Sequence, residues 1–428
     1  MKFILLLAFA LVGCATPKPK ITVGILEDRA WYGKDVETTE DKQYKLDLKS
    51  YANLLDVRAT GDAAWTLSRK PIYGEKKARK AEFDLAMKQY DPYASIFVAD
   101  LSFINFETVV GKHCDKIRRA VSFYFLTDPE AITQAIDHGF NLISFSNNHA
   151  QDCDLGRAFM KSPKKHGPLM TEESALTITP NKDFMWNGVG DSGKNVSVKQ
   201  LNIKGKDVTI ALGAISLLNW DIPNAKVFDY TQVDVEEQIE WYLKEFSDSQ
   251  ADLKILSIHT QDASGDKKPE AKAFLLLKKI ADKFIQEHDG DLVFGHGPHA
   301  WGGVKYLEKK DKTQGVIFTS TGNFLHEGLA SVAQNYVARA VYDFESMRLK
   351  QIQVIPFRNN RKIPNPPLSD GTEVDPTKIP TTYYSIKELK KRVDEKVAEG
   401  VPANFKWRVG KFTDHEKKRK GLYFASFE

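Results

Sequence analysis

The sequence contains little cysteine and no strong excess of charge of either sign. Its 428 residues include 3 cysteines, and 61 basic against 57 acidic side chains leave a formal net charge of +4. So few cysteines exclude a disulfide-rich scaffold, and so even a charge balance argues against a nucleic-acid-binding protein. No basic run is interleaved with aromatic residues as a nucleic-acid groove requires, so we expect no nucleic-acid partner.

The sequence also lacks internal repeats, low-complexity blocks and an apolar run long enough to cross a membrane. The apolar stretch at residues 3–12 falls short of the about 20 residues that a membrane-spanning helix needs. No Gly-x-Ser-x-Gly segment marks a serine nucleophile, and no histidine lies in a papain-like signature around a cysteine. With 42% apolar residues, the chain can bury one large core or two moderate ones.

The N-terminus has the features of a targeting segment. Lys2 supplies a positive charge, residues 3–12 are apolar, and Leu11–Cys14 reads Leu-Val-Gly-Cys. This resembles a bacterial lipobox, in which Cys14 is acylated; the alternative is an ordinary signal peptide that contains a cysteine. We expect residues 1–20 to be a lipoprotein signal peptide and tether that leave the protein exported and lipid-anchored at the cell envelope. Ala15, the residue after Cys14, is not the aspartate that favours inner-membrane retention, so the outer membrane is preferred.

The two remaining cysteines, Cys114 and Cys153, each lie shortly after a polar loop motif. An exported protein meets oxidising conditions, in which these two residues would form a disulfide that braces both loops. The alternative is a pair of buried free thiols. Sequence does not decide between the two, because it does not fix the distance between the two Cα atoms.

Apolar runs alternate with amphipathic stretches through most of the chain, which indicates an α/β protein. Helices are predicted over 128–139, 234–246 and 269–287. Segments 66–92 and 156–185 have the composition of insertions or surface loops. Strands are predicted at 56–60, 95–98, 101–106, 140–146, 208–212, 253–258, 291–294, 304–307, 315–320 and 347–356.

Composition divides the mature chain into two parts. We expect residues 21–357 to form one α/β domain, and residues 358–428 to form a proline-rich linker followed by a basic amphipathic extension. An amphipathic helix is predicted near 385–398. The basic cluster at 417–420 is interpreted as a solvated helix end, or alternatively as an anchor near an anionic surface.

Polar motifs follow the predicted strands at several points along the chain. A lone Gly-Asp is usually a turn and a lone buried histidine is usually hydrogen-bonded core, so a single motif is weak evidence. Imidazole nitrogens with carboxylate or amide oxygens at neighbouring strand ends suit Mn, Fe or Zn better than Ca. Together they predict a metal-dependent hydrolase site. The motifs are Gly61-Asp62, Asn105-Phe106-Glu107, Asn147-Asn148-His149 with Asp152, His259, Gly295-His296-Gly297-Pro298-His299 and Gly322-Asn323-Phe324.

The order of these motifs resembles the bacterial capsule-synthesis family of the CapA type. That family (PGA_cap) is associated with poly-γ-glutamate capsule production and is related to calcineurin-like metallophosphoesterases. The resemblance covers residues 57–356, and Asn-Asn-His with Gly-His-x-Pro-His are its most specific parts. It implies an α/β (α+β) fold, a metallophosphoesterase-like four-layer αββα sandwich with a peripheral C-terminal extension and its site at the strand ends.

The resemblance also implies roles for individual residues. His149 would be catalytic, as the proton donor to a leaving oxygen, and Glu107 would be able to bridge two ions. The expected cofactor is one or two divalent metal ions, Mn, Fe or Zn. The implied metal ligands are Asp62, Glu107, Asn148, His259, His296 and His299. Further substrate or loop candidates are Asn147, Asp152 and Asn323.

The chain departs from the pattern at two motifs. Typical metallophosphoesterases begin with Asp-x-His, whereas Asp62 is followed by Ala63 and Ala64, so that histidine is missing. One metal position would then be under-coordinated, which implies a single metal or weak catalysis. After His259 the family usually has Trp-Gly and an acidic residue, but this chain has Thr-Gln-Asp over 260–262.

Three functional hypotheses follow. The leading one is a metal-dependent phosphoesterase-like hydrolase that acts on an anionic envelope polymer, such as poly-γ-glutamate, or on its phosphorylated precursor. The alternative is a non-catalytic capsule-assembly component that binds an anionic polymer or a membrane synthase complex; the missing histidine and the basic segments favour it. A metal-dependent amide hydrolase of a γ-glutamyl polymer is the third.

Overall fold

The computed structural model describes residues 52–64, 83, 97–114, 116–117, 125–155, 165–261, 271–300, 302–311, 313–326, 335–357, 407–412 and 422–427. Several sequence-based predictions lie outside these residues: the signal peptide with Cys14, most of segment 66–92, the helix near 385–398 and the basic cluster at 417–420. Within the described residues, no helix is both long enough and apolar enough to cross a bilayer.

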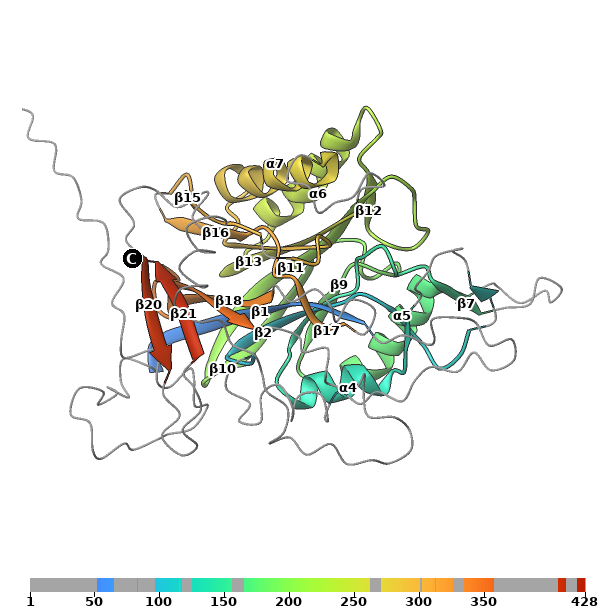
Figure 1. The fold of residues 1–428 in the computed structure, drawn as a ribbon, viewed down its shortest axis with the longest axis horizontal. Helices are drawn as coiled ribbons and strands as arrows, with labels where there is room; N and C mark the ends of the chain where they lie inside the picture. Colours follow the sequence, from blue (N-terminus) through green and yellow to red (C-terminus); the bar gives the residue numbers. More distant parts are fainter. Residues whose placement is uncertain are drawn as a thin grey trace, which may run out of the picture.

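Two mixed β-sheets form the centre of the molecule (Figure 1). The larger sheet has nine strands in the order β20-β21-β19-β18-β1-β2-β6-β9, and β17 pairs with β1 off this path. Its strands are β1 (Leu54–Ala64), β2 (Leu101–Phe106), β6 (Leu142–Ser144), β9 (Met185–Asn187), β17 (Asn323–His326), β18 (Asn335–Asp343), β19 (Leu349–Phe357), β20 (Trp407–Phe412) and β21 (Leu422–Phe427).

The smaller sheet has seven strands in the order β10-β11-β13-β14-β16-β15, and β12 pairs with β11. Strands β11, β13, β14 and β16 run parallel to one another and form its buried centre. Its strands are β10 (Ser197–Ile203), β11 (Lys206–Leu218), β12 (Val227–Asp229), β13 (Leu253–Thr260), β14 (Leu292–His296), β15 (Val304–Glu308) and β16 (Gln314–Phe318).

Short strands complete the fold on the side of the larger sheet. β3 (Val109–Val110) pairs with β5 (Leu126–Thr127) in a sheet of two strands. β4 (Lys116–Ile117), β7 (Cys153–Leu155) and β8 (Lys165–His166) form a further sheet of three strands, and a single 3-10 turn, η1 (Thr179–Asn181), follows α5.

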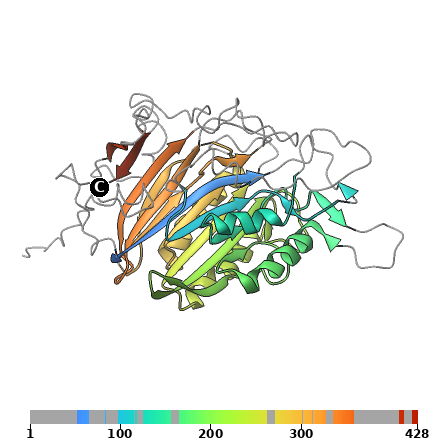
Figure 2. The ribbon, with the colours of Figure 1, turned by 90° about the horizontal axis from the view of Figure 1, so that it is seen from below.

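The two large sheets pack face to face, and helices cover their outer faces. The rings of Phe103 and Phe294 lie 5.1 Å apart in the core between the sheets. α4 (Glu130–Asp137) and α5 (Gly167–Ile178) cover the nine-stranded sheet, while α6 (Val235–Asp248) and α7 (Lys272–Glu287) cover the other, above it in Figure 1. Figure 2 shows the blue, cyan and orange strands of one sheet against the yellow and green strands of the other. The predicted four-layer αββα sandwich is therefore confirmed.

Segment 156–185 is predicted to be an insertion or a surface loop, and the loop alternative is wrong for its second half, which forms α5 and the first residue of β9. The apolar residues of α5 do not form a clear stripe along one face of the helix, because Met170 and Ala175 are buried while Leu176 is 48% exposed. α5 packs against the nine-stranded sheet, and its Ala175 lies in the same hydrophobic cluster as Phe106 of β2. Tertiary packing rather than helical periodicity therefore determines α5.

Two strands within the predicted C-terminal extension continue the nine-stranded sheet. β21 pairs antiparallel with β19 through three register partners, beginning with Ile352 opposite Phe427. β20 then pairs antiparallel with β21 at the edge of the sheet. Residues 407–412 and 422–427 are thus joined to the sandwich by main-chain hydrogen bonds.

Candidate metal centre

The predicted site residues come together at one end of the sandwich, and both sheets contribute. Asp62 lies near the end of β1 and Glu107 directly follows β2, its parallel neighbour. His259 and His296 lie in β13 and β14 and are direct register partners in the smaller sheet. Because the carboxyl ends of parallel strands meet at one edge of a sheet, each sheet delivers its polar side chains to a common place.

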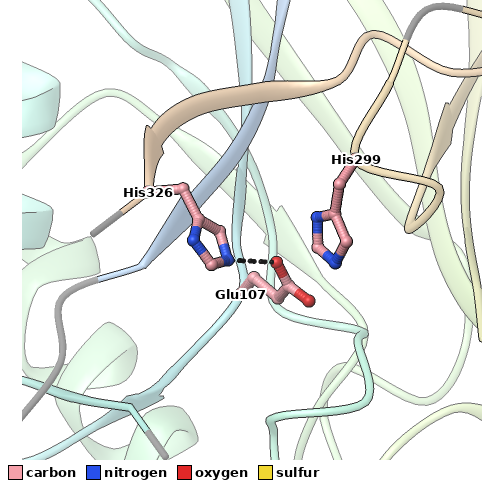
Figure 3. Close-up of side chains that lie close together, drawn as sticks. All are labelled: Glu107, His299 and His326. Carbon is pink, nitrogen blue, oxygen red and sulfur yellow. Dashed lines mark hydrogen bonds and ion pairs between the residues drawn. The ribbon is translucent and has the colours of Figure 1, made fainter. Parts of the chain in front are cut away.

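Glu107 lies at the centre of this site, and its side chain is completely buried. Its carboxylate approaches three imidazoles: His326 Nε2 lies 3.0 Å from Oε2, and His259 Nε2 and His149 Nε2 lie 3.7 Å and 3.9 Å from Oε1. Figure 3 shows the carboxylate of Glu107 between the rings of His326 and His299. A carboxylate surrounded by imidazoles is an arrangement that holds transition-metal ions.

Asp62 is a second buried carboxylate of the site. His296 Nδ1 lies 3.1 Å from its Oδ1 and His299 Nδ1 3.6 Å from its Oδ2, while Asn105 Nδ2 donates to Oδ1 at 2.7 Å. Burial raises the pKa of Asp62, but the hydrogen bond and charge of His296 outweigh burial and hold that pKa well below its ordinary value. Asp62 is therefore an ionised carboxylate inside the protein.

Burial keeps two histidines of the site neutral. It lowers the pKa of His259 from 6.5 to about 3, although the charge of Asp62 acts in the opposite direction. Burial likewise lowers the pKa of His299, against the attraction of Glu107. A neutral imidazole with a lone pair on one nitrogen is the form that binds a metal ion.

Among the residues that the structure describes, two groups of three side chains have the spacing of a metal site, and Glu107 belongs to both. In each group one ligand atom per residue lies within 4.8 Å of the others. Within the described part of the chain, His296 Nε2 and Asn105 Oδ1 are buried without a hydrogen-bond partner, as expected of atoms placed for a ligand. This mixture of nitrogen and oxygen donors fits Mn, Fe or Zn. The groups are Asp62 with Glu107 and His259, and Glu107 with His299 and His326.

The predicted ligands are not all placed alike. Asp62, Glu107, His259 and His299 fall within the two groups, whereas His296 lies beside Asp62. Asn148 is 2% exposed and immediately precedes His149 in the loop after β6.

Asp152 positions His149. The Nδ1 atom of His149 lies 2.5 Å from Asp152 Oδ2, which also accepts the backbone N–H of Phe125 at 3.0 Å. The Phe125 ring packs edge-on against the imidazole, with 4.5 Å between ring centroids. With Nδ1 hydrogen-bonded to this carboxylate, Nε2 faces Glu107 and the candidate metal groups, where a proton donor to a bound substrate would have to lie.

The loop candidates Asn147 and Asn323 hold other site residues in place. Asn147 Nδ2 donates to the Phe106 carbonyl at 2.6 Å, and its Oδ1 accepts the backbone N–H of His149 at 3.0 Å. Asn323 Oδ1 lies 2.8 Å from His299 Nδ1. This contact leaves His299 Nε2 as the nitrogen for a cation.

Gly61 lies inside β1 and not in a turn, contrary to the usual meaning of a lone Gly-Asp pair. A Cβ atom at Gly61 would lie 1.9 Å from the carbonyl oxygen of Gly322, which accepts the backbone N–H of Asp62 at 3.0 Å. A side chain at this position would therefore push β17 away from β1.

Cys114 and Cys153 form a disulfide with a Cα–Cα distance of 5.5 Å. Both cysteines are buried in a small cluster with Val109, Leu126 and Met170. Cys153 directly follows Asp152, so the bond fixes the loop that carries the partner of His149.

Serine at both cysteines, C114S/C153S, is expected to destabilise the protein by about 2–4 kcal/mol, since a cross-link across 39 residues no longer restrains the unfolded chain. Thermal unfolding followed by circular dichroism measures the change. Reduced wild-type protein is the matched control and should show the same loss. An unfolding temperature that is the same in all three samples would contradict the bracing role.

The fold and the site together define an αββα sandwich protein with a candidate metal centre at one end of its two sheets. Residues 57–157 match the family model described as bacterial capsule synthesis protein PGA_cap. The resemblance predicted from the sequence is thereby confirmed over a segment that contains Asp62, Glu107 and His149. No curated protein matches the chain.

Solved structures align with the chain at low similarity. A novel phosphatase from Mycoplasma pneumoniae gives a TM-score of 0.39 at 14% identity, over 72% of this chain and 95% of that one. A hypothetical protein from Thermus thermophilus gives 0.37 at 13% identity, over 72% and 100%. GAP50, the anchor in the inner membrane complex of Plasmodium, gives 0.29 at 10% identity, over 72% and 85%.

Proposed function

We propose that the protein is a metal-dependent phosphoesterase-type hydrolase that acts in capsule synthesis, on an anionic envelope polymer such as poly-γ-glutamate or on its phosphorylated precursor. The observation that carries the proposal is the buried Glu107 carboxylate, which approaches three imidazoles while belonging to both metal-ligand groups. The family match over residues 57–157 supports the link to capsule synthesis.

The residues of the site divide into metal ligands and a proton donor. Asp62, Glu107 and His259 would hold one ion, and Glu107 with His299 would help to hold a second. Bound ions of this kind polarise an anionic centre and lower the pKa of a coordinated water. His149, held by Asp152, would give its Nε2 proton to the oxygen of the departing group.

Export and anchoring belong to the same proposal and rest on the N-terminal sequence, in which Cys14 follows Leu-Val-Gly. We expect a labelled fatty acid to become attached to the protein in bacterial cells, and we expect Cys14→Ala to abolish the label. A membrane synthase complex would then be a partner within reach of the anchored domain. Equal labelling of the wild type and the variant would rule out the lipid anchor.

The direct test is to purify the full chain in detergent with Mn, Fe or Zn, to measure bound metal by mass spectrometry, and to assay an aryl phosphate ester. We expect one or two ions per chain and turnover that chelation abolishes and metal restores. A chain that binds no ion from any of the three metals and shows no turnover would refute the proposal.

One observation favours the non-catalytic alternative, in which the protein is a capsule-assembly component. Ala64 stands where the Asp-x-His motif of metallophosphoesterases has a histidine, so β1 itself supplies one imidazole fewer. Binding of purified poly-γ-glutamate that is equally tight before and after chelation, in a chain without turnover, would support this alternative.

A further inference from the structure

His326 occupies the place in the site that Ala64 leaves without an imidazole. Strands β1 and β17 run parallel, and their register pairs Asp62 with Asn323 and Ala64 with His326. Asp62 and Ala64, two residues apart on a strand, point to the same face, the one on which the candidate metal centre lies. The neighbouring strand thus carries a histidine directly beside the alanine.

An irregularity in β17 turns His326 toward the site. Between the two register pairs, β1 advances by two residues and β17 by three, which is the pattern of a β-bulge. Phe324 and Leu325 both pack into the cluster on the outer face of the sheet, whereas Asn323 and His326 contact site residues. Strict alternation would have placed Leu325 in the site and His326 outside it.

The contacts of His326 are those of a residue inside the metal centre. Its Nε2 lies 3.0 Å from Glu107 Oε2, and its ring packs edge-on against His299 with 5.3 Å between centroids. Phe125 packs edge-on against it from another side at 5.1 Å, and the side chain is only 1% exposed. Figure 3 shows His326 and His299 on opposite sides of the Glu107 carboxylate.

We propose that His326 is a metal ligand, and that β17 supplies the imidazole that an Asp-x-His motif would supply from β1. The inference rests on the proposed metal centre and completes its second group, Glu107 with His299 and His326. The ion that these residues would bind is a divalent transition metal ion, because two imidazoles and a carboxylate form the donor set.

The test compares metal binding by the full chain with that of three variants: His326→Ala, the double variant Ala64→His/His326→Ala, and His113→Ala as a control at an exposed histidine. Zn²⁺ affinity is measured by competition with a chelator, and Co²⁺ absorption reports on the number of nitrogen ligands. We expect His326→Ala to weaken one ion by more than about 100-fold, since loss of an outer partner of a ligand already costs 10–100-fold.

The double variant separates a ligand from a structural residue. It returns an imidazole to the same place from the neighbouring strand and fills the volume that alanine at 326 leaves, so we expect affinity within about 10-fold of the wild type. His326→Gln, measured without metal, shows whether the fold itself depends on this side chain. Suppose that His326→Ala and His326→Gln both bind metal more weakly and both unfold at a lower temperature without metal. That result would overturn the inference in favour of a structural role.

The outcomes also separate this inference from the proposed function. A wild-type chain that binds no metal refutes the proposed metal centre as a whole. A wild-type chain that binds metal, alongside a His326→Ala variant with the same affinity and the same Co²⁺ spectrum, overturns only the role of His326.

Discussion

Replacement of His149 by asparagine is expected to lower kcat for an aryl phosphate ester by about 10²–10⁴-fold, the contribution typical of a positioned general acid. The amount of bound metal should stay the same, because His149 Nε2 lies 3.9 Å from Glu107 and outside both metal-ligand groups. Steady-state kinetics and metal analysis on one preparation measure the two quantities together.

The loss of activity in His149→Asn is expected to depend on the leaving group of the substrate. A general acid matters most when the leaving group is a poor one, so the loss in His149→Asn should be larger for phenyl phosphate than for a nitrophenyl ester. Asp152→Asn is the matched control and should reproduce part of the loss, since Asp152 binds His149 Nδ1. An equal loss for both substrates, or a parallel loss of metal, would show that His149 is not the acid.

Replacement of Glu107 by glutamine is expected to have the larger effect on metal binding. Glu107 belongs to both ligand groups, so a neutral amide at this position weakens both ions. Turnover should fall by roughly 10³-fold or more, as when a group that stabilises transition-state charge is removed. Wild-type protein at a metal concentration about 100 times its Kd should gain about 2.7 kcal/mol of stability, and this gain should disappear in the variant.

Differential scanning calorimetry with and without metal measures that gain. The control is Glu287→Gln, a change of the same chemistry at an exposed position near the end of α7. Metal stabilisation of Glu107→Gln equal to that of the control would mean that Glu107 is not a shared ligand.

The helices that could be predicted most closely from the sequence are those with one clearly apolar face. α6 buries Ile239, Leu243 and Phe246 at intervals of three or four residues, and its observed range of Val235–Asp248 agrees closely with the predicted 234–246. α7 likewise buries Phe274 and Leu277, as its periodicity predicts. Both helices lie on the outside of the smaller sheet, so a single face of each meets the core.

β18 is not among the predicted strands although it lies at the centre of the larger sheet, and its charged residue is buried. Arg339 Nε lies 3.0 Å from Asp56 Oδ1, and Arg58 Nη2 donates to Asp56 Oδ2 at 2.9 Å. Burial raises the pKa of Asp56, but the two guanidinium groups outweigh it and hold the pKa at about 2. In β1 and β18, therefore, the face that carries the polar residues is buried as well as the apolar face. A sequence pattern would instead place the polar residues of such a strand in solvent.

The part of the site that could be predicted from the sequence is the part that local strand structure determines. Each strand-end motif is short, and the backbone of its own strand determines where its side chains lie; Asp62, Glu107 and His259 accordingly form one group. The position of His326 depends on a pairing with a strand more than 200 residues earlier in the chain and on a bulge within β17. Neither feature has a signature in the local sequence, although the Gly322-Asn323-Phe324 motif lies close by.

The division of the site between the two sheets determines when in the life of the chain a metal ion can be selected. Asp62 and Glu107 come from the larger sheet, and His259 and His299 come from segments that follow or belong to the smaller one. Neither of the two ligand groups among the described residues is complete until the sandwich has closed, so an unfolded chain would hold no ion firmly. For the exported metal-binding protein that we propose, a chain that crosses the membrane unfolded would take its ion from the receiving compartment and not from the place of synthesis.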